Sequence, residues 1–223
     1  MLKISVSPIV KEKIPGIKLG LVEAQEVQVK KEEPRFDELF NDLVKEIQQE
    51  FAQKPLSSNE IISHVRRLYR RVGWEPTRYR PSSEALARRI LQDKGWYRIN
   101  NLVDLGNLVS ARVHLPMGLY DLDKIQGQIW LDVGKANESY QGISRHEIHA
   151  DGKLILRDDV GIFGNPTADS RRTSINEETR NILAVFFTPP EVTTPYLEKA
   201  LQMLSEYYQP LAENVQADIL KFD

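Results

Sequence analysis

The spacing of apolar residues changes along this chain, and that change constrains the fold more than any other feature. Apolar side chains alternate at period two within 2–6, 17–21 and 27–29, a pattern typical of short strands. From Phe36 to Phe51 they recur at the 3.6-residue spacing of an amphipathic helix. A chain that uses both periods is expected to pack helices on a sheet.

The rest of the chain alternates between the same two patterns. Helices are predicted from the N-cap residues Ser57-Ser58 to 72, over 81–94 and 100–113, and throughout the C-terminal segment 194–221, and strands over 128–133 and 182–187. Asp151-Gly152 suits a tight turn, which predicts a hairpin between 145–149 and 153–157. No Gly/Ser-rich linker divides the 223 residues. We therefore expect a single α+β domain over 1–223, with a mixed sheet core, peripheral helices, and residues 1–65 packed on the core.

The composition excludes several classes of site. Because the chain has no cysteine, it has no disulfide, thiolate metal site or cysteine nucleophile, which fits a reducing, cytoplasmic location. No apolar run approaches the roughly 18 residues of a membrane-spanning helix, and the first residues do not resemble an export signal, so no membrane association is expected. Phosphate-cradling loops, dinucleotide fingerprints and nucleophile elbows are absent too. We expect neither a nucleotide nor any other cofactor.

One histidine pair invites a metal site. His146 and His149 lie three residues apart on a predicted strand, where an offset of three points side chains to opposite faces. A surface hairpin without metal is the favoured interpretation, and a metal between the two imidazoles is the weaker alternative.

Positive charge is concentrated in one part of the chain. Residues 66–98 contain nine arginines and one lysine against three acidic residues, whereas the whole chain carries a formal charge of −2. Such a patch is what a protein needs to hold a phosphate backbone. The alternative is a solvated helix face with intrahelical ion pairs. The residues expected to contact RNA phosphates are Arg66, Arg67, Arg70, Arg71, Arg78 and Arg80.

Two polar segments combine turn-forming residues with many hydrogen-bonding groups. The first, 100–107, opens a predicted helix, and the second is 164–173. Gly164 and Asn165 tolerate positive φ, so backbone N–H groups there can converge on an anion or a carbonyl oxygen. The alternative is that these residues only cap a helix and order a loop. The predicted ligand-binding residues are Asn101, Asp104, Asn107, Gly164, Asn165, Thr167 and Thr173.

Five short motifs follow one another within and around these segments. They are Arg98–Asn107, Leu119–Ile125 with Gly127, Asp151-Gly152, Gly161–Gly164 and Phe187-Thr188-Pro189. In order and spacing, residues 80–190 resemble the B3/B4 editing domain of the phenylalanyl-tRNA synthetase beta subunit, and 161–173 is similar to its freestanding relatives. The resemblance implies a sandwich-like α+β core. It also implies that the domain receives the aminoacylated 3′ end of a tRNA and hydrolyses a wrong ester without a metal.

Two positions depart from that family's pattern. Gly118 stands where the synthetase domain carries a histidine near its editing site, and Leu183 stands where it carries the glutamate that recognises a tyrosine hydroxyl. Because leucine cannot accept a hydrogen bond, the tyrosine specificity of the family is not expected here.

The leading hypothesis from the sequence is an RNA-binding module of the editing type, with hydrolysis of a mischarged aminoacyl-tRNA in trans as its reaction. Asn101, Asp104 and Asn107 would orient the ester or the α-amino group, and residues of 164–173 would bind the terminal adenosine or the ester carbonyl. No general base is assigned. The alternative is a non-catalytic module that binds tRNA, an amino acid or a related small ligand. The sequence predicts no oligomeric state.

Overall fold

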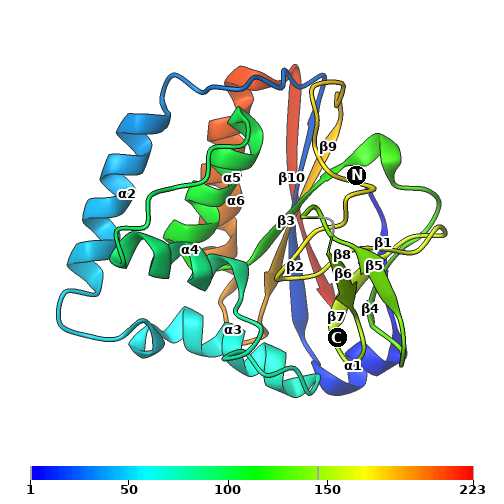
Figure 1. Ribbon diagram of the computed structural model, residues 1–223. Helices are drawn as coiled ribbons and strands as arrows, with labels where there is room; N and C mark the ends of the chain where they lie inside the picture. The colour runs from blue at the N-terminus through cyan, green and yellow to red at the C-terminus, as the bar shows by residue number, and fades with distance from the viewer. Residues whose placement is uncertain (1, 145, 223) are drawn as a thin grey trace.

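Helices and sheets form separate layers. The computed structural model describes residues 2–144 and 146–222. Its helices are α1 (Pro8–Lys13), α2 (Phe36–Glu50), α3 (Glu60–Arg71), α4 (Ser82–Leu91), α5 (Asn101–Val113) and α6 (Thr194–Tyr208). Its strands are β1 (Ile4–Val6), β2 (Ile17–Gln25), β3 (Met117–Asp121), β4 (Ile129–Val133), β5 (Ser139–Gln141), β6 (Glu147–His149), β7 (Leu154–Arg157), β8 (Ile162–Gly164), β9 (Ile182–Thr188) and β10 (Asn214–Phe222). Helices α2 to α6 lie on one side of a sheet, and a second sheet lies on its other side (Figure 1).

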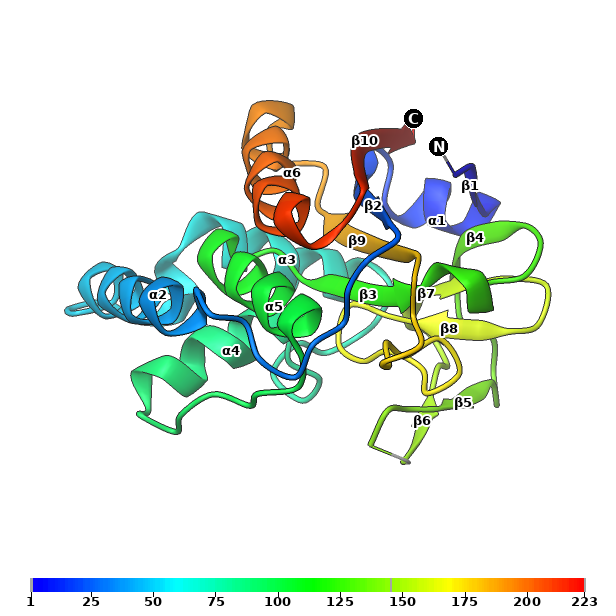
Figure 2. The same ribbon diagram turned by 90° about the horizontal axis from the view of Figure 1, so that it is seen from above.

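Two four-stranded sheets face each other. The first has the order β10-β2-β9-β3 and is antiparallel throughout, and the second has the order β1-β4-β7-β8. The second sheet is mixed because β1 pairs with β4 in parallel. Figure 2 shows the sheets as adjacent layers, with β5 and β6 as a small separate pair at one edge. The predicted α+β class, with its sandwich-like core and peripheral helices, is confirmed. The segment 1–65 contributes β1 and β2, so it supplies strands to both sheets.

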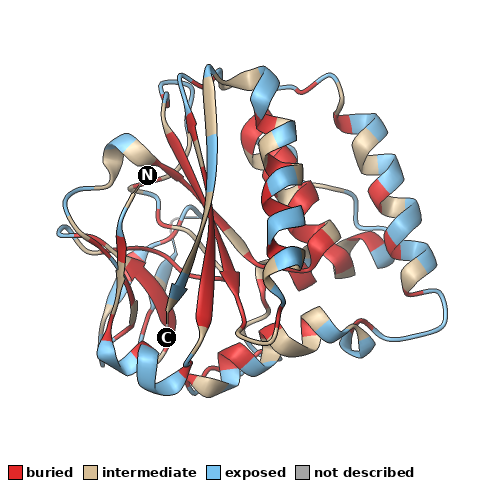
Figure 3. Ribbon diagram, turned by 180° about the vertical axis from the view of Figure 1, so that it is seen from behind, coloured by how far each residue is buried: buried red, intermediate tan, exposed pale blue. Residues whose placement is uncertain are grey.

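Apolar residues fill the space between the sheets. The ring of Tyr120 on β3 meets the ring of Phe163 on β8 edge to face, with 4.9 Å between their centroids. Leu183 lies opposite Tyr120 in the β3–β9 register and is fully buried. Figure 3 shows that burial runs along the central strands and is lost toward β10.

The outer face of the first sheet is covered by α5 and α6. A Cβ built on Gly20 of β2 would lie 2.7 Å from Leu197 Cδ1 and 2.9 Å from Leu201 Cδ2, so glycine lets α6 approach the strand closely. No helix among the residues described is long and apolar enough to cross a membrane.

Two predictions, a strand near the N-terminus and a helical segment at the C-terminus, need correction. Residues 27–29 form no strand, because Glu26 takes a positive φ of 50° and ends β2, and the Val27 N–H then bonds to Arg180 O. The segment 194–221 is helical only in α6, and its last part forms β10, which pairs along its whole length with β2. β10 is an edge strand with one exposed face, so its apolar pattern is weak. Periodicity alone could not distinguish such a strand from the end of a helix.

The predicted hairpin is also wrong, as is one helix cap. β6 pairs with β5, whereas β7 pairs with β4 and β8, so Asp151-Gly152 joins strands of two different sheets. β7 is buried on both faces, and β4 offers it an apolar partner inside the sandwich.

The N-cap of α3 is Asn59, whose Oδ1 accepts the Ile62 N–H at 3.0 Å. The serines expected to cap this helix form a separate short turn instead.

Candidate functional site

The two polar segments meet at one cavity. Asn107 comes from the middle of α5 and Thr167 from the loop after β8, and both line a cavity of about 390 Å³ beside α4. We call it the Asn107 cavity. Its lining residues are Arg80, Ser82, Ala85, Leu86, Arg88, Arg89, Gln92, Lys94, Tyr97, Asn107 and Thr167. Residues sixty positions apart in the chain are thus brought to the same hollow.

All the charged side chains of this lining are positive. Arg80, Arg88, Arg89 and Lys94 are cationic, and no carboxylate or imidazole is among the described residues that line the cavity. Such a lining favours an anionic ligand and disfavours acid–base catalysis by the cavity's own side chains.

Two lining residues carry polar atoms without a partner. Arg88 Nε and Ser82 Oγ are buried and make no hydrogen bond within the described part of the chain. An unsatisfied buried donor costs about 1–3 kcal/mol. Because both atoms are closed off from solvent, a ligand could bond to them only after neighbouring side chains move.

Eight residues that line the cavity were not assigned to the site from the sequence, and four of these share a simple spacing. Ser82, Ala85, Arg89 and Gln92 are three or four residues apart on or just after α4, so they share one face of that helix. This spacing is the signal that would have found them. Tyr97 carried no such signal, because it lies in the loop that follows α4.

Asn101 and Asp104 are fully buried and hold the protein together. Asn101 accepts the Lys30 N–H and donates to Gln28 O, each at 2.9 Å, and so ties the segment after β2 to α5. Asp104 accepts the Ile99 N–H at 3.0 Å and pairs with Arg98 at 2.9 Å. Burial raises the pKa of the Asp104 carboxyl, although both partners oppose the rise. Neither side chain lines the Asn107 cavity.

Most of the second polar segment is also turned inward. Asn165 is buried and orders its own loop: its Oδ1 accepts the Thr167 and Ala168 N–H groups, and its Nδ2 donates to Tyr140 Oη at 2.7 Å. Thr173 is fully buried against Phe163 O and Ser170 Oγ. Thr167 differs, since its hydroxyl meets Tyr69 Oη at 3.0 Å yet the residue still reaches the cavity.

Gly164 lies between the sheets, away from the cavity lining. A Cβ on Gly164, or on Gly118 across from it, would overlap the Tyr120 hydroxyl. The space beside the two glycines is therefore filled by this chain's own phenol. The Asp169 carboxyl lies against Gly118 and accepts the Leu119 N–H at 3.3 Å. Burial raises the pKa of Asp169 to about 7, and the bond from Leu119 acts against the rise.

The six predicted RNA-contacting arginines fall into three pairs. Arg66 binds Glu84 through two hydrogen bonds of 2.6 and 2.8 Å, and Arg80 reaches the same carboxylate at 3.5 Å. The bond to Glu84 raises the pKa of Arg66. Arg67 and Arg71 share Glu191.

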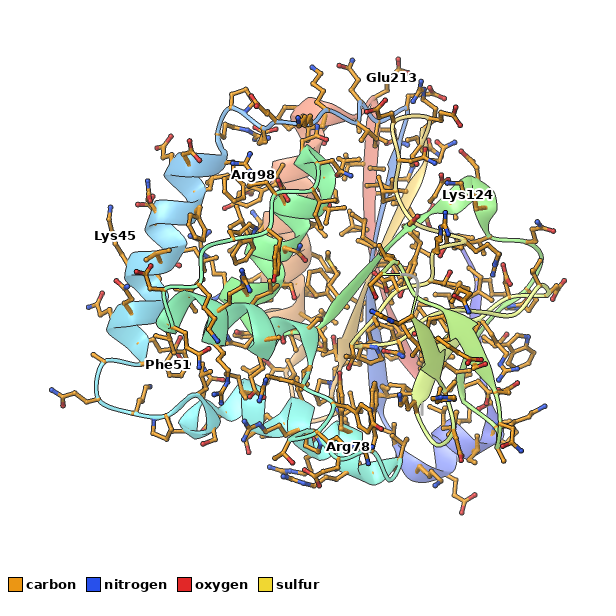
Figure 4. The ribbon with its side chains drawn as sticks, in the orientation of Figure 1. Lys45, Phe51, Arg78, Arg98, Lys124 and Glu213 are labelled. Carbon is orange, nitrogen blue, oxygen red and sulfur yellow. The ribbon has the colours of Figure 1, made fainter. Side chains whose placement is uncertain are left out.

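Within the described residues, only the third pair is free of ion pairs. Arg70 is exposed and makes no ion pair within the described residues, and Arg78 is exposed with its guanidinium over the Tyr79 ring at 5.2 Å. Figure 4 shows Arg78 at the outer edge of the molecule beside α3. It shows Arg98 between α2 and α5, where this arginine pairs with Asp37 and Asp104.

A larger cavity of about 570 Å³ lies beside the N-terminus of α5. It is lined by Val29, Lys30, Lys31, Ile99, Asn100, Ile175, Asn176, Glu177 and Glu178. Its charges are of both signs, and neither Asn107 nor Thr167 reaches it. We therefore place the candidate site in the smaller, uniformly cationic cavity. No group of three or more histidines, aspartates and glutamates within residues 2–144 and 146–222 is arranged to hold a metal ion.

Comparison with known proteins gives the family. Residues 64–219 match the family model of the B3/4 domain. The chain belongs to the B3/4 domain family. This match includes α4, α5 and the loop after β8, and therefore every residue of the Asn107 cavity.

The curated relatives are much longer proteins. The phenylalanine–tRNA ligase beta subunit of Fusobacterium nucleatum is 33% identical over 105 residues, which are 42% of this chain and 12% of that protein. The subunit of the same name from Yersinia pestis is 30% identical over 116 residues, 48% of this chain and 14% of that protein. An N-terminal fragment of the phenylalanyl-tRNA synthetase beta subunit from Pyrococcus horikoshii superposes over 98% of this chain and 52% of its own, with a TM-score of 0.47 and 12% identity.

Proposed function

We propose that this B3/4 protein is an RNA-binding module that receives the single-stranded 3′ end of a tRNA in the Asn107 cavity. The observation that carries the proposal is the cavity's lining: four cationic side chains and no acidic one among the described residues, with an amide and a hydroxyl from the two polar segments. Lysine and arginine bind phosphate oxygens, and the amide and hydroxyl supply direction. Its relatives' names point to tRNA as the nucleic acid.

The free arginines extend this surface beyond the cavity. Arg70 and Arg78 are exposed and without ion pairs in the described structure, so they are available to phosphates. Arg66 and Arg71 are engaged with Glu84 and Glu191, and we assign them a smaller share of the RNA contact. Backbone contacts of this kind position an RNA with little sequence preference.

Hydrolysis of a mischarged aminoacyl-tRNA in trans is the second candidate function. Asn107 and Thr167 offer hydrogen-bonding groups that can orient an ester carbonyl or a water molecule. Because no described lining residue is a general base, the reaction would depend on a positioned water and on the ribose hydroxyl beside the ester. The alternative is binding of tRNA or of a small ligand without hydrolysis. The cationic lining fits this alternative as well as it fits hydrolysis.

One set of measurements separates these functions. Binding of a tRNA and of a microhelix with a single-stranded 3′ end is measured from 50 to 300 mM salt, and a panel of mischarged tRNAs is assayed for deacylation. We expect an affinity that falls with salt, with a logarithmic slope of about −3 from the four cationic residues of the cavity and a steeper slope where Arg70 and Arg78 also contact phosphates. Asn107→Ala is expected to weaken binding of the 3′ end and to abolish any turnover.

The matched control is Asn41→Ala, an exposed asparagine on α2 far along the chain from the cavity lining. It should leave affinity and turnover unchanged. Salt-independent binding, or equal effects of the two substitutions, would exclude the cavity as the RNA site. Binding of every tRNA without turnover of any ester would leave the non-catalytic module as the function.

A further inference from the structure

One aromatic side chain of the Asn107 cavity stands out by its exposure. Tyr97 is 66% exposed, more than any other large apolar or aromatic side chain in the described chain. It follows α4 in the loop that leads to α5, and it lines the cavity together with Arg88 and Lys94. A single exposed aromatic ring is ordinary on a protein surface, so Tyr97 is notable for the cationic side chains that line the cavity with it.

The ring is held in place from one side. The guanidinium of Arg89 lies over the Tyr97 ring, with 3.8 Å from Cζ to the ring centroid. Arg89 itself is fixed, because its N–H groups donate to Lys94 O at 2.6 Å and to Gly95 O at 2.9 Å. Those carbonyls belong to the turn after α4, and Arg89 itself lies on α4, so the stacked pair is fixed to the end of the helix. The ring is thus preorganised while most of its surface remains in solvent.

We propose that Tyr97, supported by Arg89, is a stacking platform for an unpaired nucleobase, so that the cavity selects the unstacked terminal nucleotide of an RNA over a base-paired end. This inference rests on the proposed RNA-binding function and specifies the ligand of that site. Nucleobases stack on aromatic rings in single-strand binding proteins regardless of sequence, since every base has a π-face. A base in a terminal pair has only its outer face free and is held by its partner, so it cannot turn onto the ring as an unpaired base can.

The phosphate of the same nucleotide has a place beside the platform. Arg88 and Lys94 both line the cavity, and neither makes an ion pair in the described structure, so their charges are available to a phosphate. A cavity of about 390 Å³ lies within the usual size of small-ligand sites. The arrangement requires no base-specific hydrogen bond, so we expect tolerance of all four bases.

The test uses the full chain and two RNA hairpins with the same stem. One ends in four unpaired 3′ nucleotides with 2-aminopurine at the last position, and the other ends blunt. We expect quenching of the 2-aminopurine fluorescence on binding and tighter binding of the first hairpin. Tyr97→Ala should weaken binding of the first hairpin about tenfold and remove the quenching, and it should leave the blunt hairpin unaffected. Tyr97→Phe and Tyr97→Trp should retain both properties.

The control substitution is Val160→Ala, at another exposed apolar side chain that does not line the cavity. It should change neither binding nor fluorescence. Wild-type affinity and quenching in Tyr97→Ala would overturn the stacking proposal while RNA binding itself stands. Equal affinity of the two hairpins would overturn it too. Failure of the wild-type protein to bind either hairpin at low salt would instead overturn the proposed function and, with it, this inference.

Discussion

Replacing Arg66 with alanine is expected to destabilise the fold, whereas replacing Arg70 is expected to weaken RNA binding without that loss. Both residues lie on α3, four positions apart. Glu84, the partner of Arg66, is only 1% exposed and is held by two hydrogen bonds from that guanidinium. Without Arg66, the carboxylate would keep only the distant contact with Arg80 at 3.5 Å.

The expected loss follows from the burial of the pair. Removing one partner of a buried ion pair costs about 3–5 kcal/mol, because a charge is left without compensation. The Arg66 side chain is 19% exposed, so water can reach part of the gap, and we take the lower end of about 3 kcal/mol. For a protein of this size that corresponds to a fall in Tm of roughly 6–12 °C. Arg70 is exposed and unpaired, so Arg70→Ala should change stability by less than about 0.5 kcal/mol.

Urea unfolding measures the loss of stability in each variant, and the salt dependence of RNA binding measures the lost phosphate contact. Arg70→Ala should reduce the logarithmic salt slope by about 1, as expected for one lost phosphate contact. Adding Glu84→Gln to Arg66→Ala should recover part of the lost stability, because a neutral amide needs no counter-charge. Equal stability of the two single variants would refute the assignment of Arg66 to the interior. So would an Arg66→Ala protein that loses RNA affinity but no stability.

Three further substitutions test the contacts around the site. Asn101→Ala removes both bonds to the segment after β2 and should lower the unfolding free energy by about 1–3 kcal/mol in urea. Gly20→Ala would force Leu197 and Leu201 away from β2 and should cost about 1–3 kcal/mol in thermal unfolding. Burial raises the pKa of Asp169 to about 7, so its protonated form favours the native state and that contribution is lost as pH rises from about 4 through 7. Asp169→Asn should remove this pH dependence, as measured by urea midpoints at pH 5 and pH 8, and an unchanged profile would contradict it.

Local patterns in the sequence were sufficient for most helices. The 3.6-residue stripe from Phe36 onward marks α2, the proline and serines near 81 mark α4, and Asn100 caps α5 as its position suggests. The buried strand β9 is a continuous apolar run ended by proline. Each signal depends on residues within one turn or one strand of each other, so no tertiary information was needed.

The pairing of the strands could not be predicted from such local signals. β7 was assigned to the wrong hairpin because Asp151-Gly152 fits a tight turn, whereas the choice of β4 depends on apolar faces that meet only in the sandwich. The same limit applies to the polar segments. Asparagines that bind backbone groups and asparagines that line a cavity look alike in sequence, so Asn101 and Asn107 could not be told apart.

The sequence alone determined the type of most elements, the concentration of positive charge in 66–98 and the resemblance to the B3/4 family. Only the tertiary structure decided which of those charges are free. Glu84 neutralises Arg66 from 18 positions away and Glu191 neutralises Arg71 from 120 positions away, while Arg70, between them, has no such partner in the described chain. The physical reason is that an ion pair depends on a distance of a few ångströms in space, and neighbours in the sequence do not determine that distance.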